Sequence, residues 1–378
     1  MARIAYSMSG EGRGHATRVR GMVEMLRSSH EVVLYASGDA SELLAAPYAG
    51  TGVEVRELPC LRFAYGPGGR VDRLRTLAAA VPFVRRLSSL GARLASDLRR
   101  ERFDLAITDF EPALPRAARR CGVPVVSLDH QHLLVESELS FLPIRLRWHA
   151  AVMGLVVRAF VPHADATIVS SFHQPPARRT RRDVRHIGVV LRPELLAAAP
   201  RRGEHLTVYL RRSVPESLLD TLAATGRPVH VFGLGPRPPR GTLRFEPVSE
   251  SAFVSSLASA AALVTTAGNQ VVGEAIFLGK PVLALPEPGN AEQEINAHLL
   301  AVSGAGLWAA MGEVDESRLG EFESRLEDLR SRCLQLSPNG NAAALAAVAR
   351  HLPTRPAPVR QPRVVRAPLR PAPLGGRP

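Results

Sequence analysis

Short runs of β-branched and other apolar residues alternate with longer arginine- and alanine-rich stretches, and this alternation occurs twice along the chain. Strands that alternate with helical stretches of about 10–15 residues are typical of parallel, doubly wound sheets. The first series of expected strands covers residues 4–9, 31–36, 53–58, 105–108, 124–127 and 166–170, and the second covers 206–209, 229–232, 243–245, 262–264 and 281–284. We therefore expect an α/β fold with two Rossmann-like domains that face a central cleft.

The length of 378 residues is enough for two such domains and further segments, since one domain takes about 150 residues. We place an N-terminal domain at 1–190, a linker at 191–204, a C-terminal domain at 205–335 and a helix at 336–352 that could return to the first domain. Residues 353–378 mix proline, arginine, alanine and glycine, which bury little apolar surface, so we expect a disordered tail.

Composition excludes several classes of protein. Hydrophobic residues make up 46% of the chain and charged residues 22%, which is ordinary for a soluble protein and excludes a wholly disordered or collagen-like chain. Three distant cysteines, Cys60, Cys121 and Cys333, form neither a disulfide framework nor a zinc spacing and fit a reducing compartment. We identify no signal peptide and no spanning segment, and expect a cytoplasmic protein, with attachment to the inner face of the plasma membrane as an alternative.

The formal net charge is +13, and Lys280 is the only lysine among the 48 basic residues. Such a charge is compatible with an anionic membrane surface or nucleic acid as partner. No aromatic residue interleaves the arginines of the tail, so we do not expect nucleic-acid binding. Residues 139–161 mix large apolar side chains with arginines and Trp148, which predicts either a segment on an anionic membrane or a core-packed helix.

A glycine-rich loop, residues 9–18, follows the first expected strand and contains Gly10, Gly12 and Gly14. Glycines at a strand-to-helix corner allow a tight turn and the close approach of an anionic ligand to backbone N–H groups. A dinucleotide site is the alternative, but its fingerprint needs a third glycine where His15 stands. Asp39, after the second expected strand, could be the ribose-binding acid of that fingerprint, although its spacing is long.

His15 is the strongest candidate for a general base, because imidazole takes up a proton near neutral pH. Asp109 follows the expected strand 105–108, and parallel strands end at one edge of a sheet, so its carboxylate could orient the ring. The alternatives are a structural histidine and an aspartate that caps the next helix. The segment 129–132, Asp-His-Gln-His, predicts lining of an acceptor pocket by Asp129, Gln131 and His132, with structural polar contacts or a metal site as alternatives.

The second domain contains a strand, a Gly-Asn turn, a helix and a Gly-Lys-Pro connection across residues 262–284. The N-terminus of that helix, near Gly268, offers backbone N–H groups to a phosphate. Glu274 in the same helix could accept hydrogen bonds from ribose hydroxyls, or be an exposed glutamate. The polar residues Glu292 and Gln293 could contact sugar hydroxyls, or begin a solvated helix.

These segments occur in the order and spacing of the GT-B glycosyltransferases, and about 350 residues of the chain resemble the MurG-like and UDP-glycosyltransferase group. The chain is most similar to a bacterial and archaeal branch with a Gly-Glu-Gly-x-Gly-His-Ala-Thr-Arg loop and an Asp-x-Gln-His segment, which residues 9–18 and 129–132 match. The resemblance implies an N-terminal acceptor domain with Gly10, Gly12 and Gly14 near the acceptor, and a C-terminal domain for a nucleotide-sugar donor, UDP-sugar above all.

The resemblance further implies inverting transfer without a metal or other cofactor, in which His15 deprotonates the acceptor hydroxyl and Asp109 orients it. The helix N-terminus would neutralise the leaving diphosphate. Donor contacts fall on Arg211, Ser213, Val248, Thr266, Gly268, Asn269, Gln270, Glu274, Glu292 and Gln293. The acceptor would be lipid-linked, a polysaccharide or a small molecule.

Two positions depart from the family pattern. Thr266 stands where many relatives carry a phosphate-binding histidine, and residues 209–213 contain Arg211 and Arg212 where relatives often have glycine and serine. The arginines could contact phosphate or block the cleft. Two other functions therefore stay open: a sugar-nucleotide epimerase on the same fold, and a non-catalytic protein that binds a sugar nucleotide or a polyanion.

Overall fold

A computed structural model describes residues 1–10, 13–59, 73–162, 164–180, 182–211, 214–247, 249–336 and 338–353. Several sequence predictions lie outside these residues. They concern Gly12, Cys60, Arg212, Ser213, Val248 and the tail beyond Pro353.

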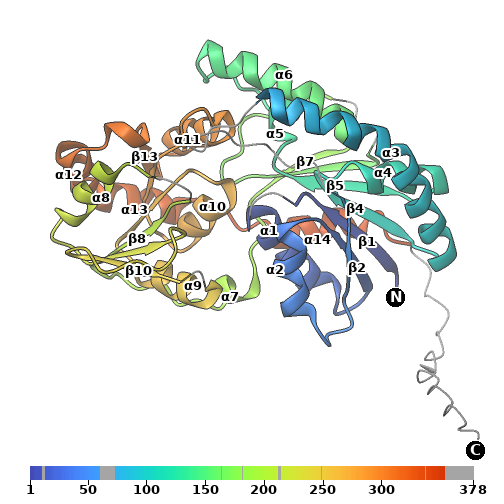
Figure 1. Cartoon of the computed structure of the whole chain (residues 1–378), viewed down its shortest axis with the longest axis horizontal. Helices are drawn as coiled ribbons and strands as arrows, with labels where there is room; N and C mark the ends of the chain where they lie inside the picture. Colours follow the sequence, from blue (N-terminus) through green and yellow to red (C-terminus); the bar gives the residue numbers. More distant parts are fainter. Residues whose placement is uncertain are drawn as a thin grey trace, which may run out of the picture.

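The first domain is built on a seven-stranded parallel sheet with the strand order β3-β2-β1-β4-β5-β6-β7 (Figure 1). Its strands are β1 (Arg3–Met8), β2 (Glu31–Ala36), β3 (Glu54–Glu57), β4 (Leu105–Asp109), β5 (Val125–Asp129), β6 (Ala166–Ser170) and β7 (Val184–Ile187). Its helices are α1 (Arg13–Leu26), α2 (Asp39–Tyr48), α3 (Arg73–Glu101), α4 (Ala113–Cys121), α5 (Leu133–Glu136) and α6 (Ile144–Phe160).

The second domain has a six-stranded parallel sheet in the order β10-β9-β8-β11-β12-β13. Its strands are β8 (Leu206–Tyr209), β9 (Val229–Phe232), β10 (Leu243–Glu246), β11 (Ala262–Thr265), β12 (Val282–Ala284) and β13 (Gly306–Trp308). The helices after β7 are α7 (Pro193–Leu196), α8 (Glu216–Ala223), α9 (Glu250–Ser259), α10 (Asn269–Phe277), α11 (Ala291–Ser303), the 3-10 turn η2 (Met311–Glu313), α12 (Glu316–Ser324), α13 (Leu326–Gln335) and α14 (Asn341–Ala349). The expected fold class is confirmed.

Helices cover both faces of each sheet, which is why the central strands consist almost entirely of apolar residues. In β1, Ile4 and Tyr6 pack with α1 and α2 on one face, whereas Ala5 packs with α3 and α4 on the other. All five residues of β4 are buried. Period-two alternation therefore divides the first core into two layers, one on each side of the sheet.

The linker between the domains runs between α1 and α10. Gly21 of α1 and Gly273 of α10 allow this, because an added Cβ would lie 2.8 Å from the Leu191 carbonyl oxygen and 2.6 Å from a Val189 methyl group, respectively. Asn341, at the start of α14, donates to the Leu191 carbonyl at 2.8 Å and accepts from its N–H at 2.7 Å. Helix α14 then packs in the core of the first domain through Ala344, Ala347 and Val348.

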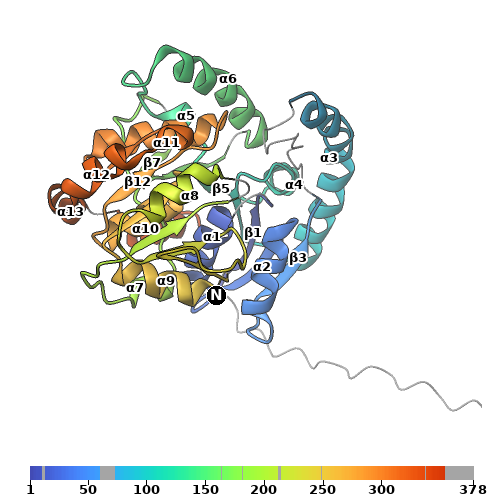
Figure 2. The same ribbon diagram turned by 60° about the vertical axis from the view of Figure 1, so that its left-hand side comes forward.

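Both sheets reverse their winding direction at equivalent places, between β1 and β4 in the first and between β8 and β11 in the second. Ligands of open α/β sheets bind outside the carboxyl ends of the strands at such a switch point. The contact of α1 with α10 brings the two switch points face to face (Figure 2). No helix in the described ranges combines the length and the apolar character needed to cross a bilayer.

We predict opposite effects for two helical Gly→Ala substitutions. Gly21→Ala should lower the free energy of unfolding by about 1–3 kcal/mol, because the new methyl group would press on the Leu191 carbonyl oxygen. Gly320→Ala in α12 should raise it by about 0.5–1 kcal/mol, since nothing lies within 4 Å of its added Cβ and alanine is the better helix former. Urea denaturation measures both, and a Gly21→Ala protein as stable as the parent would contradict the tight passage of the linker.

Candidate active site

His15 and Asp109 meet at the switch point of the first sheet. Asp109 is the last residue of β4, and His15 lies in the first turn of α1, directly after the β1 loop. His15 Nδ1 lies 2.8 Å from Asp109 Oδ1, and the two side chains are 14% and 0% exposed. The ring is therefore tied to a buried carboxylate and still reaches the edge of the cleft.

Arg18, one helical turn after His15, forms a bidentate ion pair with the same carboxylate. Its Nε and Nη2 donate to the two oxygens of Asp109 at 2.8 and 2.7 Å, and the side chain is 3% exposed. Burial lowers the pKa of the Arg18 guanidinium, but the charge and hydrogen bonds of Asp109 outweigh this and hold that pKa above its ordinary value. Asp109 is thus a fixed anion whose charge is already balanced by a cation.

Two side chains lie close to His15 Nδ1 and constrain the tautomer of the ring. Asp109 Oδ1, an acceptor, lies 2.8 Å from Nδ1, and Arg18 Nη2, which can only donate, lies 3.1 Å from it. The shorter contact favours a proton on Nδ1 and a lone pair on Nε2, from which the side-chain nitrogen of Gln131 lies 3.5 Å away. A lone pair on Nε2 is what a histidine needs to accept a proton from a substrate.

Asp109 does not cap the following helix, which was the alternative reading of this residue. The buried carboxylate of Glu111 does so instead, accepting from the N–H groups of Ala113 and Leu114 at 2.7 and 2.9 Å. Phe110 between them has a φ of 56°, a conformation that residues other than glycine rarely adopt. The turn at Phe110 thus separates the carboxylate of Glu111, which caps the helix, from that of Asp109, which binds His15.

The residues of the Asp-His-Gln-His segment at the end of β5 do not all lie near His15. Asp129 and His132 are both buried and bind each other, with His132 Nδ1 2.7 Å from Asp129 Oδ2, and Ser127 donates to the same carboxylate at 2.6 Å. Burial raises the pKa of Asp129, but His132 and the hydrogen bonds outweigh it and hold that pKa well below its usual value. Only Gln131 of the predicted acceptor lining approaches His15, whereas Asp129 and His132 make the structural polar contacts of the alternative interpretation.

His130 of the same segment crosses to the second domain. Its Nε2 lies 2.9 Å from the side-chain oxygen of Asn296 in α11, and its Nδ1 lies 3.1 Å from the Ser170 carbonyl oxygen. Burial lowers the pKa of His130, although Glu292 and the hydrogen bonds to Asn296 and Ser170 raise it. The predicted metal alternative finds no support, since no group of three or more His, Cys, Asp or Glu side chains in the described part of the chain could hold a metal ion.

In the second domain, α10 begins without a side-chain cap. Gly268 is its N-cap residue, and among the described residues no side chain accepts from its first N–H groups, so the positive end of the helix could receive an anion. Ala267 has a φ of 63° and Thr266 is buried before it. The side chains of Asn269 and Gln270 do not point to open space. Asn269 donates to the Ser170 carbonyl at 3.2 Å, and Gln270 donates to the Val190 carbonyl at 2.9 Å.

Glu274 is buried rather than exposed, and it has a basic partner far away in the sequence. Arg192 of the linker donates to Glu274 at 3.1 Å and to Glu250 of α9 at 2.8 Å, and Gln270 donates to Glu274 at 3.3 Å. Arg20 of α1 binds Glu250 as well. Burial raises the pKa of Glu274 although Arg192 lowers it. The ion pairs join α1, the linker, α9 and α10.

The remaining predicted residues are distributed around this centre. Glu292 is exposed in the first turn of α11, and Gln293 is buried, where its side-chain oxygen accepts from the N–H of Glu287 at 2.7 Å. Arg211 is half-buried after β8. Gly10 packs on the loop after β2, since an added Cβ would lie 2.4 Å from the Ser37 carbonyl oxygen. Gly14 lies at the domain boundary, where an added Cβ would lie 3.6 Å from the Cβ of Gln270.

Comparison with known proteins identifies the family. The model of glycosyl transferase family 1 matches residues 2–327. This chain belongs to glycosyl transferase family 1. An uncharacterized glycosyltransferase of Methanosarcina acetivorans is 23% identical to this family 1 chain over 354 residues, which cover 86% of the chain and 90% of that protein.

Two solved structures share the fold of this family 1 enzyme. Phytolacca americana UGT2, complexed with UDP-2fluoro-glucose and pterostilbene, has a TM-score of 0.67 at 17% identity and covers 92% of this chain and 99% of its own. Acinetobacter baumannii MurG has a TM-score of 0.61 at 14% identity, with coverages of 93% and 100%. The resemblance to GT-B glycosyltransferases is confirmed, and the chain is a glycosyltransferase.

Sequence reasoning missed several partners of the predicted residues. Arg18 was part of the glycine-rich loop pattern, but an arginine on a helix gives no signal that its side chain is buried. Arg192 and Asn296 lie 82 and 166 positions from the residues they bind, Glu274 and His130. Such pairs become visible only when the two domains are assembled.

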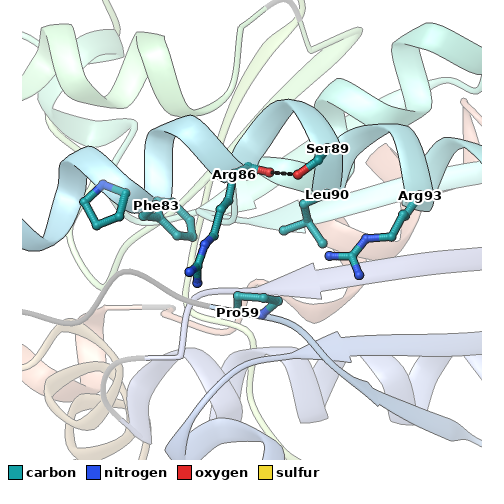
Figure 3. A pocket seen from close by; sticks show the side chains of 7 residues that line it. Pro59, Phe83, Arg86, Ser89, Leu90 and Arg93 are labelled. Carbon is teal, nitrogen blue, oxygen red and sulfur yellow. Dashed lines mark hydrogen bonds between the residues drawn. The ribbon is translucent and has the colours of Figure 1, made fainter.

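A pocket of about 480 Å³ lies apart from this centre, between the end of β3 and α3 (Figure 3). It is lined by Pro59, Pro82, Phe83, Arg86, Ser89, Leu90 and Arg93. The guanidinium groups of Arg86 and Arg93 stand beside the apolar side chains of Phe83 and Leu90 (Figure 3). None of the predicted site residues of the glycosyltransferase lines this pocket.

We predict that Asp109→Asn lowers the free energy of unfolding by about 3–5 kcal/mol, because it leaves the buried Arg18 guanidinium without a counter-charge. The double variant Arg18→Met/Asp109→Asn should recover much of that loss, since it removes both charges. The exposed pair Arg318–Glu321 provides the control, and Glu321→Gln should change stability by about 0–1 kcal/mol. Urea denaturation that finds Asp109→Asn no less stable than Glu321→Gln would refute a buried ion pair.

Proposed function

We propose that the protein is an inverting, metal-independent glycosyltransferase that moves a sugar from a nucleoside-diphosphate donor, with UDP-sugar favoured, to an acceptor hydroxyl. The observation that carries the proposal is the His15 ring, whose Nδ1 lies 2.8 Å from the Asp109 carboxylate and whose side chain is 14% exposed. An oriented imidazole of this kind is suited to remove one proton from a hydroxyl group.

In the proposed step, His15 Nε2 takes the proton of the acceptor hydroxyl as its oxygen attacks the anomeric carbon. The bond from that carbon to the diphosphate oxygen breaks, and the nucleoside diphosphate leaves with the electron pair. Attack from the side opposite to the leaving group inverts the anomeric centre. Asp109 fixes the ring and stabilises the imidazolium that forms.

Arg18 has a positioning role in this proposal. The bidentate guanidinium fixes the direction in which the Asp109 Oδ1 faces the ring. The Arg18 contacts therefore keep the carboxylate, and with it the histidine that it binds, in one orientation before the acceptor arrives.

The donor diphosphate is proposed to bind at the open N-terminus of α10, after Gly268. The helix dipole and the free N–H groups there would stabilise the negative charge that develops on the leaving diphosphate. Glu274 is proposed to accept from the ribose hydroxyls. Arg192 also binds Glu250, so it would keep one acidic partner when Glu274 turns to the nucleotide.

His15→Ala should lower the transfer rate by about 10²–10⁴-fold and leave donor affinity unchanged, because the general base is lost while the second domain is untouched. The rate is measured as release of nucleoside diphosphate from a donor that binds, with candidate acceptors or water as the acceptor. Added imidazole should restore part of the activity. A parallel collapse of donor affinity would instead place His15 in the nucleotide site.

Calorimetric titration with UDP, GDP, TDP and NADH, without added metal, should find saturable binding of one nucleoside diphosphate. Glu274→Gln should weaken it by about 10–100-fold, since a hydrogen bond to a charged acceptor is lost. Glu250→Gln is the matched control, because it removes the other acidic partner of Arg192, and should change the affinity by less than about threefold. Binding of NADH alone, or of no nucleotide, would refute a sugar-nucleotide site.

A further inference from the structure

Helix α6 exposes a continuous apolar stripe to solvent. The stripe consists of Ile144, Trp148, Val152 and Leu155, whose exposures lie between 57% and 69%. Their spacing of three or four residues puts them on one face of the helix. Single exposed apolar residues are ordinary, but a stripe of four large ones along three turns indicates an interaction surface.

The stripe is not the side of α6 that holds the helix in the fold. The opposite side, with Leu146, Ala150, Gly154 and Val157, is buried and packs against α5. An added Cβ on Gly154 would lie 3.6 Å from a Val135 methyl group. Helix α6 is thus apolar on both sides, and the packing within the chain uses only one of them.

The charged side chains that α6 itself carries all have one sign. Arg145, Arg147 and Arg158 are exposed, and α6 contains no acidic residue. Arg145 binds Glu294 of α11. Within the described ranges, Arg147 and Arg158 have no carboxylate partner. Arginine and tryptophan beside exposed aliphatic side chains are the residues that amphipathic segments present to anionic lipid.

Helix α3 also exposes apolar side chains. Val81 and Val84 are 47% and 59% exposed, and the neighbouring Arg85 is exposed as well. Helix α6 and the first part of α3 both lie along the upper side of the molecule in two views (Figures 1 and 2).

We propose that this side of the first domain, centred on the α6 stripe, binds the surface of an anionic lipid bilayer. The aliphatic side chains and Trp148 would enter the boundary between headgroups and acyl chains, and the arginines would contact lipid phosphates. The arginines of α6 favour this occupant over a second copy of the chain, because two identical sets of arginines would repel each other on close approach.

The position of α6 connects this surface to the cleft. Helix α6 packs against α11, and α11 carries Glu292 and Gln293 in its first turn. Docking through α6 would therefore hold the mouth of the cleft at the lipid surface, and the acceptor class would be a hydroxyl carried on a membrane lipid. The acceptor class rests on the proposed function, whereas lipid binding itself does not.

The first test measures co-sedimentation of the full chain with phosphatidylglycerol-containing vesicles and with pure phosphatidylcholine vesicles. The protein should bind the anionic vesicles, and Val152→Ser/Leu155→Ser should lower the partition coefficient by about tenfold, because two exposed aliphatic groups are removed. Leu334→Ser on α13, where Leu334 is 72% exposed, is the matched control and should bind like the parent. Equal binding of the α6 double variant would overturn the proposal, since other basic segments would then carry the binding.

The second test locates the helix in the bilayer. Trp308→Phe leaves Trp148 as the single tryptophan of the chain. Its emission should shift to the blue with anionic vesicles and be quenched by brominated lipids. Absence of both effects, or a dimer in lipid-free solution that buries Trp148, would overturn the proposal. Neither test requires a nucleotide or a transfer rate. Both therefore report on lipid binding even if the proposed transferase function is wrong.

Discussion

The Asp109 carboxylate is the centre on which the first half of the site depends. It is fully buried, yet both of its oxygens are bound, one by Arg18 alone and one by Arg18 and His15 together. A buried anion without partners would be protonated or would destabilise the fold. The bidentate ion pair keeps the carboxylate charged, and it does so from the same helix that carries His15. The sequence His-Ala-Thr-Arg therefore places a base and the counter-charge of its orienting acid one turn apart.

The strand order explains why these residues meet at all. β1 and β4 are neighbours with a parallel register that sets Met8 beside Asp109. The chain enters α1 from β1 and α4 from β4, so the two loops diverge to opposite faces of the sheet and leave a crevice between them. Glu111 caps α4, so the Asp109 carboxylate does not bind the N–H groups at the start of that helix. The same geometry recurs at β8 and β11, where the open N-terminus of α10 faces the crevice.

Much of this arrangement could be predicted from the sequence, and the omissions have physical causes. The buried strands are apolar runs, and the rule for strand ends is enough to pair His15 with Asp109. Strands β7 and β13 were missed because they are short edge strands, with only one residue of each fully buried. The glycine-rich loop was expected over residues 9–18, but Arg13 and Gly14 already belong to α1. The partner of Glu274 could not be predicted, since nothing in a local pattern links it to Arg192.

The contacts between the domains are polar where the ligands are proposed to bind and close-packed where the linker passes. Asn269, Gln270 and Glu274 all bind groups of the first domain or the linker, through hydrogen bonds and one ion pair. A polar contact can be exchanged for an equivalent contact with a ligand at small net cost, whereas an apolar contact cannot. The side chains proposed for the donor thus bind the first domain and the linker through bonds of the kind that a diphosphate and a ribose would replace. Donor binding and these contacts would then compete for the same amides and the same carboxylate, which makes the relative position of the domains sensitive to the nucleotide.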